Sequence, residues 1–82
     1  MTVRVRLFGQ EAHAVGQATV SVTLDDQPCT YAKLRDALLA AEPRLATTLR
    51  HGRFAVNHVF ASDAQPITAT DEVALIGLVS GG

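Results

Sequence analysis

The segment Val73–Val79 has no polar side chain at any position and includes Gly77. A strand with one face in solvent alternates between apolar and polar residues, whereas a strand covered on both faces does not. The segment is also far too short to cross a membrane. We therefore expect a strand at the centre of a sheet, or a strand whose outer face is covered by a partner.

Two earlier segments have the alternation that this one lacks. Thr2–Phe8 and Gln17–Leu24 each place apolar residues at every second position, which predicts two strands with one solvated face. Gly9–Gly16 between them interrupts the alternation. The residues expected to point inward are Val3, Val5 and Leu7 of the first strand and Val20, Val22 and Leu24 of the second.

The middle of the chain has helical periodicity. Asp25–Pro28 is typical of a turn, and Thr30 after it is a suitable N-cap. Pro43 is expected to end the helix. The apolar stripe consists of Tyr31, Leu34, Leu38 and Ala41, spaced by three or four residues, and Leu45 and Leu49 are expected to add one further turn.

Short strands are expected after the helix. Phe54–Asn57 and His58–Ala61 indicate two of them with a tight joint, and the turn-rich Asp63–Thr70 leads to the final apolar segment. Eighty-two residues suffice for one small domain, residues 1–82. The element order predicts an α+β fold in which one main helix packs on one face of a small mixed sheet.

Composition excludes several functions. A net charge of −1 and a pI of about 6.2 leave no basic excess for nucleic acid. Cys29 is the single cysteine, so no internal disulfide can form, which fits a reducing compartment such as the cytoplasm. No charged segment followed by an apolar one opens the chain, and we expect neither a secretory signal nor a membrane span.

Few side chains suggest chemistry of their own. Cys29 precedes the expected helix and is either a reactive thiolate or an inert small side chain. Asp71 and Glu72 are adjacent and should point to opposite faces of a strand, so we expect no paired acid site. Arg4 and Arg6 share a strand face, where they pair with a partner or are solvated. The three histidines are not spaced as metal ligands usually are; they are His13, His51 and His58.

The sequence ends in Gly81–Gly82. Glycine is unfavourable at the end of a strand, because it has no side chain to pack and loses more backbone entropy on folding than other residues do. Two glycines that carry one carboxylate would form an arm thin enough for a channel that any side chain would block. The alternative is a frayed chain end of no functional importance.

These segments together resemble a known family. The ending Asp71-Glu72-Val73-Ala74, an apolar stretch and Val79-Ser80-Gly81-Gly82 resembles the C-terminus of the small subunit of molybdopterin synthase. More broadly, it is similar to the ubiquitin-like sulfur carriers, including the thiamine-pathway carrier. Val3–Gln10 and Phe54–Asn57 are similar to strands of that family. The resemblance implies a β-grasp fold with the first and last strands parallel at the sheet centre.

One pair of positions departs from the molybdopterin type. Those carriers usually have two prolines just before Val-Ser-Gly-Gly, and this chain has Gly77-Leu78 there. Two prolines would stiffen the tail, whereas Gly77 loosens it. The departure bears on the pathway within the family and not on the sulfur-carrier class.

The resemblance also implies a chemistry. Gly82 would be adenylated on a separate, E1-like activating enzyme that holds ATP and Mg²⁺, and a sulfur donor would convert the adenylate to a thiocarboxylate. Val79, Ser80 and Gly81 would thread into the partner's active site. The chain itself would be no enzyme and would bind no cofactor or metal. The large subunit of molybdopterin synthase would receive the tail, in a heterotetramer.

Docking to such partners requires an apolar patch on the sheet face opposite the helix. If Val3, Val5 and Leu7 face inward, then Phe8 faces outward, and Ile76 faces outward on the neighbouring strand. We expect Phe8 and Ile76 to form this patch near the tail. The alternative is that both are edge-of-core residues under a loop.

Other functions remain open. The sulfur could serve another pathway (thiamine, cysteine or tRNA thiolation). The chain could instead be a covalent protein modifier joined through Gly82 to lysines of target proteins. A third class is a plain interaction module with an incidental Gly-Gly end.

Overall fold

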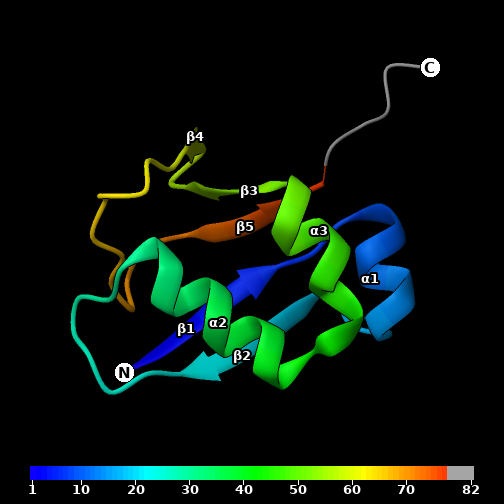
Figure 1. Cartoon of the computed structure of the whole chain (residues 1–82), viewed down its shortest axis with the longest axis horizontal. Coiled ribbons are helices and arrows are strands. Elements are labelled where there is room, and N and C mark those ends of the chain that lie inside the picture. Colours follow the sequence, from blue (N-terminus) through cyan, green and yellow to red (C-terminus); the bar gives the residue numbers. More distant parts are fainter. Residues whose placement is uncertain (78–82) are drawn as a thin grey trace.

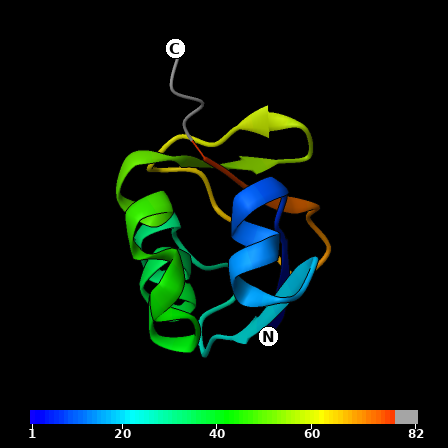
Figure 2. The same ribbon diagram turned by 90° about the vertical axis from the view of Figure 1, so that its right-hand side faces the viewer.

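The computed structural model describes residues 1–77, so the expected arm Val79–Gly82 lies outside the described residues. A sheet of five strands, in the order β2-β1-β5-β3-β4, has α2 and α3 on one side (Figures 1 and 2). The strands are β1 (Thr2–Arg6), β2 (Thr19–Thr23), β3 (Arg53–Val56), β4 (Val59–Phe60) and β5 (Val73–Ile76).

The last strand lies at the centre of the sheet, which is one of the two arrangements that its sequence predicts. β5 pairs in parallel with β1 and antiparallel with β3, which is the arrangement that the family resemblance implies. Val73 and Leu75 are buried on the helix side, and Ala74 and Ile76 are half-buried on the outer face. The strand ends at Ile76, and the residues after Gly77 that were expected to extend it lie outside the described part.

The first two strands form an antiparallel pair in which Val3 lies opposite Val22. All six residues expected to point inward are buried. The strands are shorter than their alternating segments, because regular pairing stops at Arg6 and Thr19. Leu7 continues the contact with one hydrogen bond, its N–H donating to the Ala18 carbonyl at 2.8 Å.

The main helix is α2 (Tyr31–Ala41), and Thr30 caps it as predicted. The Lys33 N–H donates to Thr30 Oγ1 at 3.2 Å, which satisfies one of the free N–H groups of the first turn. The stripe is wrong at its end, because Ala41 is exposed. Ala37, three residues after Leu34, packs against the core.

The predicted further turn after Pro43 is present as the 3₁₀ helix η1 (Pro43–Leu45) and α3 (Ala46–His51), which bury Leu45 and Leu49.

A helix α1 (Gly9–Val15) was not expected. It closes one end of the core, beside β1 (Figure 1), and ends at Gly16, whose φ of 80° favours glycine. Only Val15 of α1 is buried, so its sequence has too few apolar residues to reveal a period.

Phe54 and Tyr31 connect the sheet with α2 in the core. Their ring centroids are 4.9 Å apart, and the Phe54 N–H donates to Tyr31 Oη at 3.0 Å. Cys29 is buried nearby in the same cluster. Burial raises the pKa of the Cys29 thiol, which disfavours the thiolate and leaves the inert side chain as the better interpretation.

Candidate docking site on the outer face of the sheet

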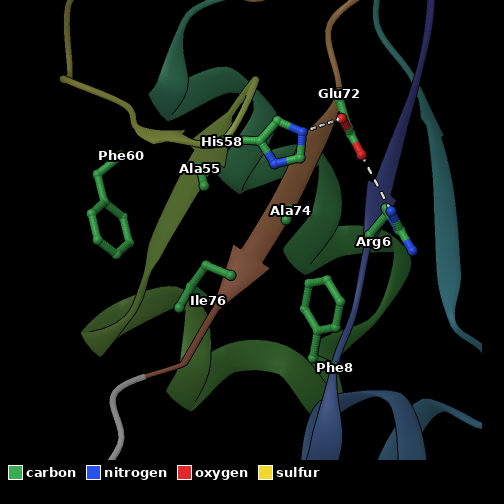
Figure 3. A pocket seen from close by; sticks show the side chains of 8 residues that line it. All are labelled: Arg6, Phe8, Ala55, His58, Phe60, Glu72, Ala74 and Ile76. Carbon is green, nitrogen blue, oxygen red and sulfur yellow. Dashed lines mark hydrogen bonds and ion pairs between the residues drawn. The ribbon is translucent and has the colours of Figure 1, made fainter.

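A hollow of about 320 Å³ lies on the sheet face away from the helices (Figure 3). Two alanines of neighbouring strands, Ala55 and Ala74, lie opposite each other and form its floor. Arg6 flanks Ala74 on β1, and Phe60 flanks Ala55 on β4. The floor is low because methyl groups stand where the flanking positions carry long side chains.

Three apolar side chains surround this floor. Phe8 and Phe60 are 48% and 65% exposed, and Ile76 is half-buried at the end of β5. Phe8 keeps an extended backbone (φ −133°, ψ 158°) before α1 begins, so it continues the alternation of β1 and faces outward. The structure therefore brings the two residues predicted for the patch, Phe8 and Ile76, to one hollow.

Sequence reasoning missed Phe60 and Ala55. Phe60 belongs to the predicted strand His58–Ala61, which is too short for alternation to show which face Phe60 occupies. Ala55 lines the hollow only because it lies opposite both Ala74 and Phe60, and that register is a property of the assembled sheet. Alternation within Phe54–Asn57 would have placed Ala55 on the outer face but not at the hollow.

The remaining side of the hollow is charged. The Glu72 carboxylate lies between His58 Nε2, at 2.9 Å, and Arg6 Nη1, at 3.2 Å (Figure 3). The Arg6 guanidinium also lies 5.7 Å from the centre of the Phe8 ring. Exposed pairs of this kind contribute at most about 1 kcal/mol to stability, so we regard them as polar recognition groups beside an apolar surface.

A two-residue turn places His58 over Glu72. Asn57 and His58 both have positive φ, 53° and 70°, as the type I′ hairpin turn between β3 and β4 requires. The Asn57 side chain accepts from the Glu72 N–H at 2.9 Å, which attaches the turn to the start of β5. The predicted strand Phe54–Asn57 is shifted by one residue from β3, and the predicted strand His58–Ala61 is longer than β4, because Asn57 and His58 form the joint.

The carboxylates of Asp71 and Glu72 have different partners. Asp71 accepts from the Thr68 N–H at 2.8 Å and from the Asn57 amide at 3.0 Å. These hydrogen bonds, the one from Thr68 first, hold the pKa of the Asp71 carboxyl below its usual value. Asp71 therefore stabilises the loop before β5, and only Glu72 faces the hollow.

The end of β5 next to the hollow is closely packed under α3. A Cβ on Gly52 would lie 2.3 Å from the Ile76 carbonyl oxygen and 2.8 Å from that of Thr48. Any side chain at Gly52 would therefore push β5 and α3 apart. This close approach fixes Ile76 and Gly77, the last described residues before the tail.

Other kinds of site find no support in residues 1–77. No group of three or more potential ligands there could hold a metal ion. No helix in that part of the chain has the length and apolar character needed to cross a membrane. Arg4 is exposed on the outer face, where it lines a shallow polar hollow with Arg6.

The central parallel strands, the mixed sheet and the main helix across one face define a ubiquitin-like β-grasp protein. The chain belongs to the ThiS family, whose model matches residues 5–82. Its fold is accordingly that of the ubiquitin-like sulfur carriers. No curated protein matches the chain.

Several solved structures are similar over the whole chain. SAMP1 from Haloferax volcanii is 30% identical, with a TM-score of 0.83 and full coverage of both chains. A putative molybdopterin converting factor subunit 1 from Pyrococcus furiosus is 15% identical, with a TM-score of 0.79 and coverage of 96% of this chain and 99% of that one. A chain from the complex of subunits 1 and 2 of the Helicobacter pylori molybdopterin-converting factor is 24% identical, with a TM-score of 0.67 and full coverage of both.

Proposed function

We propose that the chain is a sulfur carrier whose C-terminal Gly82 is adenylated and then thiocarboxylated. The observation that carries the proposal is the family match, which extends over residues 5–82 and so includes the Gly81–Gly82 ending. The exposed apolar hollow beside the end of β5 adds a surface on which a partner could hold the carrier while it works on the tail.

The chemistry explains why the end must be activated elsewhere. A carboxylate resists nucleophilic attack because it is charged and has a poor leaving group. Transfer of AMP from ATP gives a mixed anhydride and releases pyrophosphate. The terminal sulfur of a persulfide then displaces AMP at the acyl carbon, and a thiol breaks the S–S bond of the resulting acyl disulfide, which releases the thiocarboxylate and leaves a disulfide. In this proposal the nucleotide, Mg²⁺ and all catalytic groups belong to the activating enzyme and the sulfur donor, and the chain is not itself an enzyme.

The hollow is proposed as the docking surface. Phe8 and Phe60 expose about half or more of their surface, and exposed aromatic side chains around a cavity are typical anchors of protein interfaces. A partner seated there would lie next to Ile76, from which the tail continues. Val79, Ser80 and Gly81 would then reach into its active site, and the glycines at the end of the tail would fit a narrow channel there.

For the pathway, we propose the small subunit of molybdopterin synthase, with its large subunit as the partner. Support comes from the strand-entry motif Asp71-Glu72-Val73-Ala74 and the Val79–Gly82 ending. The two molybdopterin converting factor structures support the fold alone, because both are less than 25% identical to the chain. Another sulfur-dependent pathway is the alternative.

One observation favours a second function, covalent protein modification. Haloferax volcanii SAMP1, at 30% identity over its full length, is described as a small archaeal modifier protein. A modifier would use the same activated Gly82 but transfer it to lysine amines of target proteins.

To separate these functions, the chain with an N-terminal affinity tag would be recovered from its native cells and compared with a variant that carries one tryptophan after Gly82. We expect unmodified carrier accompanied by the large synthase subunit, and restored molybdopterin formation only with the natural end. Gel-shifted species with an isopeptide bond at Gly82 would indicate the modifier. Full activity of the extended variant would contradict both functions.

A further inference from the structure

The chain has one lysine, Lys33, among seven basic residues, and the other six are arginines. An arginine guanidinium stays protonated in proteins and does not attack acyl groups. A lysine amine attacks them once it loses its proton. Lys33 is therefore the one side-chain amine of the sequence that an activated carboxyl end could acylate.

The structure places this amine against a carboxylate. Lys33 lies in the first turn of α2, and its Nζ forms an ion pair with Asp26 Oδ2 in the turn before the helix. Asp25 and Asp36 line the same shallow hollow. The hydrogen bond that Lys33 donates to Asp26 is the main cause that raises the pKa of Lys33. The lysine side chain is nevertheless 59% exposed, so a reagent or a partner can reach it.

We propose that Lys33 is the single side-chain acceptor for acyl transfer on this chain and that Asp26 restrains it, so that activated copies do not join to one another. The biological meaning of this restraint rests on the proposed activation of Gly82. The reactivity of Lys33 itself does not. A carrier with an activated acyl end needs such protection, because neighbouring copies are themselves potential targets.

The restrained step is ordinary amide formation. Lys33 Nζ first loses one proton and then attacks the acyl carbon of a Gly82 adenylate. The C–N bond forms, the C–O bond to phosphate breaks, and AMP leaves with the electron pair. The nitrogen loses its second proton to solvent. The ion pair with Asp26 opposes the first of these steps by holding the proton. α2 begins at the opposite end of the molecule from the end of β5 (Figure 1), so the product would link two copies.

The test uses N-hydroxysuccinimidyl acetate as the acyl donor, which needs neither the tail nor an activating enzyme. The initial rate of acetylation at Lys33 is measured by peptide mass spectrometry at pH 8, relative to the Met1 amine of the same molecule. Asp26→Asn is expected to raise the rate about two- to five-fold, as expected from the modest strength of an exposed ion pair. Asp25→Asn is the matched control, because Asp25 lines the hollow without pairing with Lys33.

A rise in Asp26→Asn with little change in Asp25→Asn supports the proposal. An unchanged rate in Asp26→Asn, or an equal rise in both variants, overturns it. Thermal unfolding of both variants is followed by circular dichroism, and the rates are compared at a temperature where each is folded. If Gly82 proves not to be activated while Asp26→Asn still accelerates acetylation, the proposed function fails and the restraint on Lys33 stands.

Discussion

Replacing Ala74 with glutamine is expected to weaken binding of the large synthase subunit about 30-fold or more, the size of effect typical of an interface hot spot. The longer side chain would fill the hollow whose floor Ala74 forms with Ala55. Interface cores are packed as tightly as protein interiors, so a partner group seated there would be excluded. Calorimetric titration of the large subunit with each variant measures the loss.

The melting temperature of Ala74→Gln should stay within a few degrees of the original, because the new side chain points to solvent on the outer face. Ala40→Gln is the matched control: Ala40 is exposed on α2, on the other side of the sheet. It should leave the affinity unchanged. Equal affinities for the two variants and the original chain would remove the hollow from the interface.

Phe54→Ala is expected to destabilise the fold by about 3–5 kcal/mol, the usual loss for a buried phenylalanine. Phe54 is fully buried and packs on Tyr31. A small domain loses roughly 4–8 °C of melting temperature per kcal/mol, so the melting temperature should fall by at least about 12 °C. Thermal unfolding followed by circular dichroism measures it.

Phe60→Ala provides the contrast within the same hairpin. Phe60 is 65% exposed, and its truncation should change stability by less than about 1 kcal/mol while lowering affinity for the partner. Phe54→Ala would thus mainly lower stability, and Phe60→Ala would mainly lower affinity for the partner. A similar loss of stability in both variants would contradict the assignment of Phe54 to the core and Phe60 to the docking surface.

Much of the fold could be predicted because the spacing of apolar residues is a local property of the sequence. This spacing shows both the type of element and which of its faces is buried. The inward residues of β1 and β2 follow from simple alternation, and the lack of alternation in β5 indicates either a central strand or one covered by a partner. Thr30 marks the start of the main helix because its side chain can cap the first turn. Pro43 marks the end because proline disfavours helical geometry in the residue before it. The parallel pairing of β1 with β5 came from the family resemblance and not from these patterns.

The rest depended on information that only the assembled sheet contains. The hollow exists because Ala55, Ala74 and Phe60 share one row across three strands, and the register of non-adjacent strands is not visible in their sequences. The helix α1 escaped prediction because it contributes one buried residue. Lys33 was not among the predicted site residues, although the sequence shows directly that it is the single lysine.

The most direct test of the sulfur-carrier function is the intact mass of the chain after incubation with the activating enzyme of the same organism, ATP, a persulfide donor and a thiol reductant. The proposed thiocarboxylate requires a gain of about 16 Da, the replacement of one oxygen by sulfur, located on Gly82 by fragmentation. A chain amidated at Gly82 should gain nothing. An unchanged mass for the natural chain, while the enzyme converts a known carrier in the same mixture, would contradict the proposed function.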